Sequence, residues 1–432
     1  MKKAFFKSDR KILIYSLIIL LFPGFNQTIE AFQNTIQQIT YVEFSGSVID
    51  SQTNAPLVYA DLNVKGTNIR SITNNEGGFL LKVPKEYLNK KVIVSYLGYK
   101  TKQILLSDFK EDNTIISLDI LVTKLTEVNL NTVKDAKQLF LDALKNKGDN
   151  YYGNEAIMTS FYRESIKKGR KNASLSEAVI EIYKQPTKTS RKDILKLIKS
   201  RKNTNYSKLD TLALKLQGGP FSTLHTDLMK YPEYIFTEEN LIYYDFQFET
   251  ISQIDNRQVY VITFKQQGNV LSPLYYGKLY IDVSSLALLR ADYNLNVSDQ
   301  KLAAAMFVKK KPKKVNAYPL EAAYRVDYRV KDGKWYYGYS NIHLIFKVKW
   351  RGRLFNNTYT LKSEMLITDW EQNITGETPK LKESLKSTVI ISDQATGFAD
   401  PEFWGEYNII EPDKSIETAI KKISKQLEKL KS

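Results

Sequence analysis

Few residues of this 432-residue chain have the types and spacing that catalysis requires. The chain contains no cysteine, which excludes thiol chemistry, structural disulfides and cysteine-ligated zinc. Its two histidines, His225 and His343, lie far apart in the sequence, and no H-E-x-x-H motif accompanies them. A catalytic zinc site needs about three protein ligands. We therefore expect neither a zinc carboxypeptidase nor a Ser-His-Asp triad, and we predict no catalytic, cofactor-binding or metal-binding residue.

Carboxylates in the second half are another source of chemistry, because a glycosidase needs two of them at a fixed separation. The acidic residues considered are Asp245, Glu249, Asp282, Asp292 and Asp327. Most of them alternate with Lys and Arg, which is typical of an exposed strand face with cross-strand ion pairs. A carboxylate-based hydrolase is thus the weaker alternative to a protein that is not an enzyme. We interpret the neighbouring Arg163 and Glu164 as a structural ion pair between a helix and the sheet.

Basic runs favour contact with an anion. The chain has 63 Lys and Arg against 47 Asp and Glu, a formal net charge of +16. Residues 184–208 and 309–314 concentrate this charge, and we predict polyanion contacts at Arg191, Lys192, Lys310 and Lys311. A solvated loop is the alternative interpretation of these runs. Aromatic clusters at 335–339 and 243–244 are expected to pack in the core, with sugar stacking as their alternative.

The N-terminus has the pattern of a secretory signal segment over residues 1–31. Five basic residues precede an apolar run at 12–22, which is shorter than the roughly 20 residues of a membrane span. Residues 29–31 offer a cleavage site, and an uncleaved anchor is the alternative. We expect an exported protein in the periplasm or associated with the outer membrane, where lipid phosphates or acidic polysaccharides are available and nucleic acid is not.

Residues 41–130 alternate short apolar stretches with Gly, Asn and Asp turns, which predicts a seven-stranded β-sandwich. The motifs at 46–50, 55–60, 64–67, 73–79 and 94–99 closely resemble the carboxypeptidase-regulatory-like domain. That resemblance implies a transthyretin-type sandwich similar to the N-terminal extension of TonB-dependent receptors in Bacteroidetes. It also implies an accessory module without zinc ligands. Motifs at 161–164, 177–183, 277–282 and 400–407 are similar to those of Bacteroidetes envelope proteins with this domain, which implies an architecture and an address but no activity.

The remaining chain divides by its hydrophobic period. Residues 131–220 are expected to form a helical and basic connecting region, with a helix at 134–147 capped by Gly148 and a short helix at 194–198. Between these helices, residues 150–153, 160–164 and 176–184 are expected to form two strands, or a strand and a short helix. Residues 221–411 alternate with period two, which predicts antiparallel strands with one buried and one exposed face. Asp332-Gly333 predicts a hairpin turn, and residues 412–432 predict an amphipathic helix.

The expected fold is mainly β and α+β overall: the N-terminal sandwich followed by a curved, half-barrel-like antiparallel sheet with covering helices. The expected function is non-enzymatic binding or docking of an envelope protein, or of an apolar or anionic envelope ligand, with peripheral membrane contact as an option. The alternative is a carrier of lipid or lipoprotein. Its ligand would lie in a cavity under the sheet, against a face that contains Leu289, Tyr293, Phe346 and Trp350.

Overall fold

The computed structural model describes residues 40–121, 135–204, 218–254, 256–308, 312–352, 356–397 and 403–413. The expected signal segment, and residues 414–432 of the expected C-terminal helix, lie outside these ranges. Across the described ranges, no helix is both long and apolar enough to cross a membrane. The sandwich and the sheet presented below belong to the same unit of the chain.

The N-terminal part is the expected seven-stranded sandwich. One of its sheets has the strand order β4-β1-β7 and the other β3-β2-β5-β6. The strands are β1 (Tyr41–Asp50), β2 (Asp61–Val64), β3 (Arg70–Ile72), β4 (Gly78–Pro84), β5 (Lys91–Ser95), β6 (Lys102–Leu105) and β7 (Thr114–Leu118), with short helices η1 (Lys85–Tyr87) and η2 (Leu106–Asp108). Val48, Phe79 and Val92 pack between the sheets and are fully buried. Gly46 is required here, because a Cβ atom at this position would lie 1.9 Å from the carbonyl oxygen of Thr114.

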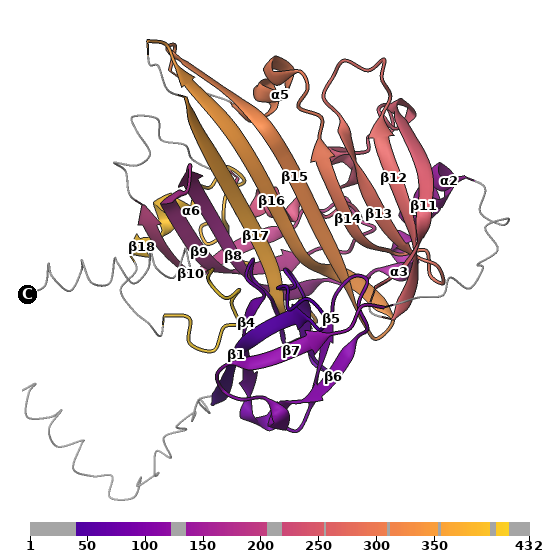
Figure 1. Cartoon of the computed structure of the whole chain (residues 1–432), viewed down its shortest axis with the longest axis vertical. Coiled ribbons are helices and arrows are strands. Elements are labelled where there is room, and N and C mark those ends of the chain that lie inside the picture. The colour runs from indigo at the N-terminus through magenta and orange to yellow at the C-terminus, as the bar shows by residue number, and fades with distance from the viewer. Residues whose placement is uncertain are drawn as a thin grey trace, which may run out of the picture. The chain divides into compact units, whose positions relative to one another are not determined.

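The rest of the chain is organised around one curved sheet with the order β11-β12-β13-β14-β15-β16-β17-β8-β9-β10-β18 (Figure 1). All neighbours pair antiparallel except β10 and β18, which are parallel. The strands are β8 (Ala156–Lys168), β9 (Lys171–Lys184), β10 (Ile194–Thr204), β11 (Tyr244–Ile254), β12 (Arg257–Gln266), β13 (Tyr275–Asp282), β14 (Leu288–Leu295), β15 (Val315–Lys331), β16 (Lys334–Trp350), β17 (Asn357–Gln372) and β18 (Thr396–Gly397). The fold is therefore mainly β, as the sequence predicts.

The expected connecting region at 131–220 is wrong as a separate region, although the two strands expected within 150–184 are present as β8 and β9. Helix α2 (Ala136–Lys145) is present, but it ends at Asn146, and Gly148 lies in the following turn α3 (Lys147–Asn150). Beyond it, β8, β9 and β10 are members of the sheet. The expected helix at 194–198 belongs to β10, because Leu195 pairs with Ile182 of β9 and is fully buried.

The β15–β16 hairpin confirms the predicted turn, since Asp332 and Gly333 both have positive φ, at 50° and 73°. The expected exposed face is present only in the half of β16 far from this turn. Near the turn, residues 335–342 are all buried, because a second layer covers the outer face. Tyr59 of the sandwich packs on Tyr339, with ring centroids 5.5 Å apart.

The inner face of the sheet is covered by helices and turns from four parts of the chain. The expected cover by the helix at 134–147 is confirmed, since Phe140 of α2 lies 4.8 Å from Phe236 and 5.7 Å from Phe246, ring to ring. Phe236 also packs on Phe264 of β12 at 5.1 Å. The other short elements are α4 (Pro220–Leu224), η5 (Pro232–Tyr234), η6 (Leu241–Tyr243), α5 (Gln300–Phe307) and α6 (Ile391–Gln394). Together these contacts fill the concave face between β11 and β14 with side chains.

Candidate functional site

One edge of the large sheet collects four connections between its strands. The strand pairings place the β8–β9, β12–β13, β14–β15 and β16–β17 connections together at this edge. The β15–β16 turn at Asp332 lies at the other ends of the strands. We call the edge with the four connections the distal edge. In Figure 1 it lies at the top, where α5 and the long strands β15 and β16 end.

Three sequence segments meet at this edge and are free of acidic residues. Residues 165–175, 308–320 and 345–358 contain four, five and four Lys or Arg, thirteen in total, and no Asp or Glu. The backbone joins them directly: Gly169 N–H donates to the carbonyl of Thr358, and Arg351 N–H donates to that of Lys314, each at 2.9 Å. The charges of their described residues therefore add up at one place rather than being spread along the chain.

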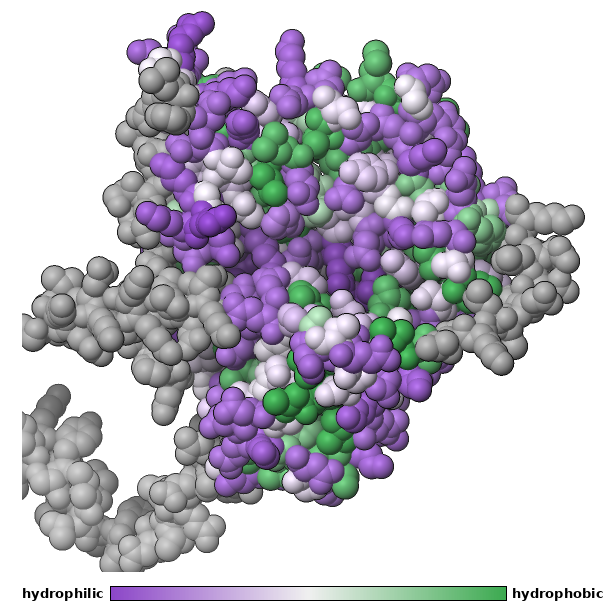
Figure 2. All heavy atoms as spheres, viewed as in Figure 1, coloured by the Kyte–Doolittle hydropathy of each residue, from purple (hydrophilic) through white to green (hydrophobic). Residues whose placement is uncertain are grey.

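Nine of the thirteen basic residues lie within the described ranges, and we call them the basic rim. They are Lys167, Lys168, Arg170, Lys171, Lys313, Lys314, Lys347, Lys349 and Arg351. All are exposed or half-exposed, and Lys349 Nζ lies 5.4 Å from the ring centroid of Tyr318. Figure 2 shows hydrophilic side chains over the ends of these strands. Clustered cations create a positive potential that attracts anions.

Two of the four predicted polyanion contacts, Arg191 and Lys192, lie away from this rim. Lys310 and Lys311 lie outside the described residues, although they belong to one of the three basic segments. Arg191 and Lys192 lie on the β9–β10 connection, at the opposite edge of the sheet, where Arg191 pairs with Glu155 at 2.6 Å. The sequence pattern does not reveal the rim, because its members become neighbours only through strand pairing. The acid-free runs themselves are visible in the sequence.

The four residues of the predicted ligand face separate into two clusters. Leu289 and Tyr293 are buried in the large core, and the Tyr293 ring stacks on Tyr324 at 5.1 Å. Phe346 is buried in a smaller cluster with the half-buried Trp350, and its ring meets that of Phe307 at 5.6 Å. The structure thus gives these residues packing partners, and their role as a ligand face stays a prediction.

Two of the five carboxylates form the expected cross-strand ion pairs, Glu249 with Lys278 at 2.7 Å and Asp292 with Arg325 at 3.9 Å, whereas Asp327 is buried. Asp245 and Glu249 are exposed on β11, but Asp327 is only 1% exposed. It accepts hydrogen bonds at 2.6 Å from both Arg290 and Arg325. Burial opposes ionisation of Asp327, yet the guanidinium groups of these two residues and Arg329 outweigh it and hold its pKa below the ordinary value. This arrangement is an ion cluster linking β14 and β15.

Asp282 and Asp292 serve different local roles. Asp282 accepts hydrogen bonds from the backbone of Ser284 and Ser285 in the turn after β13. Asp292 lies on β14 at 3.9 Å from Arg325 Nε. Each carboxylate is therefore engaged by the chain itself, in a turn or an ion pair.

Arg163 and Glu164 point to opposite faces of β8 and are not paired with each other, contrary to the expected helix-to-sheet ion pair. Arg163 binds Glu177 at 2.7 Å and donates to the carbonyl of Ile410 at 2.7 Å, so it joins two strands to the C-terminal segment. Glu164 is buried and accepts a hydrogen bond from the Tyr162 hydroxyl at 2.8 Å. Burial raises the pKa of Glu164 to about 7.

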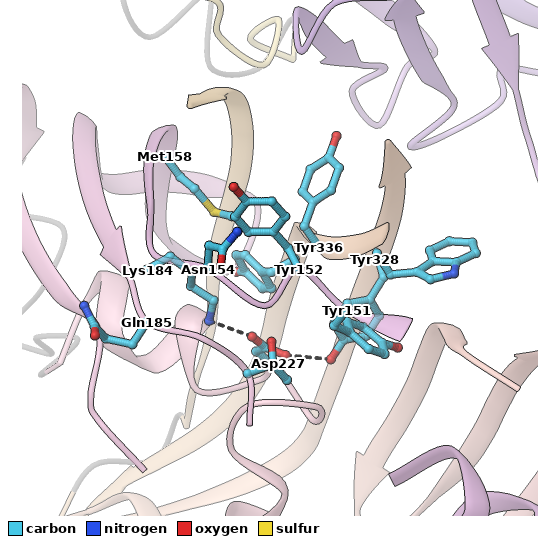
Figure 3. A pocket seen from close by; sticks show the side chains of 12 residues that line it. Tyr151, Tyr152, Asn154, Met158, Lys184, Gln185, Asp227, Tyr328 and Tyr336 are labelled. Carbon is cyan, nitrogen blue, oxygen red and sulfur yellow. Dashed lines mark hydrogen bonds and ion pairs between the residues drawn. The ribbon is translucent and has the colours of Figure 1, made fainter. Parts of the chain in front are cut away.

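A narrow pocket lies between β9, the segment after α4 and the β15–β16 hairpin (Figure 3). Within it, Lys184 Nζ lies 2.7 Å from Asp193 and 2.8 Å from Asp227, and the Tyr328 hydroxyl donates to Asp227 at 2.9 Å. The aromatic side chains at 335–337 that line it are at most 4% exposed, which confirms core packing for them. The pocket has room for about one water molecule, and its lysine is ion-paired with two carboxylates of the chain itself. It is better described as a buried polar contact than as a ligand site.

Among the described residues, no group of three or more His, Cys, Asp or Glu side chains is arranged to hold a metal ion. His343 lies on β16 and His225 follows α4, where its ring stacks on Tyr234 at 4.5 Å. Burial lowers the pKa of both histidines.

Comparison with known proteins identifies one part of the chain. Solved structures with a similar fold include a DUF1329 family protein from Desulfovibrio piger, with 12% identity over 56% of this chain and 95% of that one and a TM-score of 0.23. A LolA superfamily protein from Nitrosomonas europaea has 8% identity over 58% and 98%, with a TM-score of 0.18. Lipovitellin has 10% identity over 59% and 28%, with a TM-score of 0.24. At such TM-scores these likenesses carry no argument about function.

No curated protein matches the chain. A family model does: the CarboxypepD_reg-like domain matches residues 44–133. This range contains every strand of the N-terminal sandwich except the first residues of β1. Residues 44–133 are therefore a CarboxypepD_reg-like domain, which accounts for about a fifth of the chain.

Proposed function

We propose that this chain is a non-enzymatic, exported protein of the cell envelope that docks onto a polyanionic envelope component through its basic rim. The observation that carries the proposal is the convergence of the nine described basic residues of the rim, from three distant segments whose sequences contain no Asp or Glu. A basic side chain near an anionic surface contributes about 1 kcal/mol, so a cluster of this size supports salt-sensitive attachment.

The packing of the inner face favours docking over carriage of an apolar ligand. Leu289 and Tyr293 contact side chains of the chain itself, and α2 with Phe236 covers the face between β11 and β14. A carrier would have to move these elements to make room for an acyl chain. Native mass spectrometry with solvent extraction separates the two functions. A lipid-sized mass excess on the purified protein would favour the carrier, and the mass of the chain alone would favour docking.

The docking proposal is tested with immobilised heparin as a polyanion probe. We expect that replacing Lys313, Lys314, Lys349 and Arg351 by Ser lowers the salt concentration at which the protein elutes. The matched control replaces four exposed sandwich lysines by Ser, namely Lys65, Lys85, Lys100 and Lys110. Both variants lose four positive charges, so the control should elute close to the wild type. Equal shifts in the two variants would mean that only net charge matters, and would overturn the proposed role of the rim.

Export is tested separately, by fractionation of the source cells. We expect the protein in the periplasmic or outer-membrane fraction, with an N-terminus shortened by about the length of a signal segment. Recovery of the full-length chain in the cytoplasm would contradict the envelope part of the proposal.

A further inference from the structure

The distal edge also carries exposed apolar side chains, which a soluble polyanion would not need. Among the described residues, fourteen large hydrophobic side chains are strongly exposed. Three of them belong to the connections at this edge, and two more lie on η6, which a backbone hydrogen bond joins to the β12–β13 connection. These five are Ile242 (61% exposed), Tyr243 (41%), Leu271 (85%), Leu302 (41%) and Met306 (48%). Single exposed hydrophobic residues are ordinary, but a group beside a basic cluster is typical of a surface that meets a partner.

Two of these side chains are held outward by a helix. Leu302 and Met306 lie four residues apart on α5 and so share one face. The opposite face is fixed: Ala303 is fully buried and the Phe307 ring packs on Phe346. Asp299 caps the helix by accepting from the backbone of residues 301 and 302 at 2.9 Å. The helix therefore presents both side chains to solvent in a fixed direction.

The β12–β13 connection presents Leu271 in the same way. Gln266 spans its base, where Nε2 donates to the carbonyl of Val270 at 2.6 Å and Oε1 accepts from the backbone of Leu274 at 2.9 Å. Next to it, the backbone of Gln267 donates to the carbonyl of Tyr243 at 2.9 Å, which joins η6 to this connection. The exposed tip is thus built into the fold, with its backbone hydrogen-bonded on both sides.

Charge at this edge fits an anionic lipid surface. Connections 169–170, 267–274, 296–314 and 351–356 contain one acidic residue, Asp299, and it is engaged as the cap of α5. The segment around η6 adds the exposed Glu238, Glu239 and Asp245, so the basic part of this edge is the side of α5 and the rim. Residues 309–311 follow α5 directly and are all lysine. Apolar side chains flanked by Lys and Arg are the pattern by which peripheral proteins enter the boundary between lipid headgroups and acyl chains.

We propose that the distal edge is a docking surface for an anionic lipid bilayer. Leu271, Leu302 and Met306 enter the headgroup region while the basic rim contacts lipid phosphates. This inference rests on the proposed function, because it uses the same rim, and it names the polyanion as a membrane.

The test is cosedimentation of the full chain with phosphatidylcholine vesicles, with and without about 30% phosphatidylglycerol. We expect binding only to the anionic vesicles. A triple variant, Leu271→Ser, Leu302→Ser and Met306→Ser, should bind them at least about tenfold more weakly, because three side chains no longer leave water. Its elution from heparin should be unchanged. The control variant, Leu105→Ser, Ile115→Ser and Leu381→Ser, removes exposed apolar side chains elsewhere and should bind like the wild type.

Two results would overturn the inference while leaving the proposed function intact. One is retention on heparin without any binding to anionic vesicles, which would point to a soluble or polysaccharide partner. The other is vesicle binding that falls in the rim variant and not in the triple variant, which would mean attachment by charge alone. Neither result would change the outcome of the heparin experiment, which tests the proposed function of the rim separately. Thermal melting of each variant verifies folding, and these exposed positions should leave the melting temperature within about 1 °C.

Discussion

The buried carboxyl group of Glu164 predicts how the stability of the protein depends on pH, and this prediction does not rest on the proposed function. This carboxyl group lies on β8, is 6% exposed, and accepts a hydrogen bond from Tyr162 at 2.8 Å. Burial raises its pKa from 4.5 to about 7. The folded protein therefore holds a proton on Glu164 between about pH 4.5 and pH 7, whereas the unfolded chain has released it.

This bound proton determines whether the stability rises or falls with pH. Over that interval the folded state binds one proton more than the unfolded state, so the free energy of unfolding falls as the pH rises. A tenfold change in proton affinity is worth about 1.4 kcal/mol, so the rise in pKa from 4.5 to about 7 gives a loss of about 3 kcal/mol over this interval. Glu164→Gln stays neutral at every pH and avoids this loss. We expect the free energy of unfolding of the variant to rise by about 3 kcal/mol relative to the wild type between about pH 4.5 and pH 7. Above about pH 7 this difference should stay constant.

The assay is thermal unfolding of both proteins from pH 4 to pH 8, with the difference in melting temperature plotted against pH. For a chain of this length, 3 kcal/mol corresponds to about 4 °C if sandwich and sheet unfold together. Contributions from all other titrating groups cancel in the difference. Glu371→Gln, which changes an exposed carboxylate of β17, is the control and should run parallel to the wild type. A flat curve for Glu164→Gln, or one that falls with pH, would refute the reasoning.

Two further predictions concern the sheet and its outer layer. Gly277→Ala should lower the melting temperature clearly, because the new Cβ atom would lie 2.2 Å from the carbonyl oxygen of Asp292, whereas Gly153→Ala, with no atom within 4 Å of its Cβ, should not. Equal melting temperatures would show that β13 and β14 can separate at little cost. A chain ending at residue 402 should be less stable and more readily proteolysed than one ending at Asp413, because it loses the Arg163 contact with Ile410 and the Asn75 bond to Asp413 at 2.7 Å. Equal proteolysis rates would contradict that role for residues 403–413.

The parts of the fold that the sequence predicts well are those determined by local chemistry. Turn residues separate the sandwich strands, and Asp332-Gly333 closes the longest hairpin with the positive φ angles that such a turn needs. Strand β10 is harder to predict, because its lysines resemble those of a solvated loop. In the structure Lys196 pairs with Glu181 at 3.3 Å and Lys199 donates to the carbonyl of Phe403 at 3.3 Å. Both partners are distant in sequence, so no local pattern reveals them.

The same limit explains the buried charges. Asp327 alternates with Arg325 and Arg329, which in isolation indicates an exposed strand face. The sandwich covers that face, and Asp61 binds Arg329 at 3.1 Å. A buried ion pair of this kind is tolerated only when its partners are all present. The second layer therefore decides which strand face is exposed. The period-two pattern of a strand carries no information about where that layer docks.

The sandwich also determines which end of the sheet is left to bind a partner. Its contacts with the sheet involve the half of β15–β17 near the Asp332 turn: Tyr59 on Tyr339, Asp61 on Arg329, and Asn68 on the carbonyl of Trp370. The distal ends of β15 and β16 extend beyond this covered half and carry lysine and arginine. Alone, a run such as 347–351 has the alternation of any half-exposed strand. Paired with 313–314 and 167–171, it becomes part of a basic surface that the fold itself assembles, and this assembled charge is what the proposed docking onto an anion depends on.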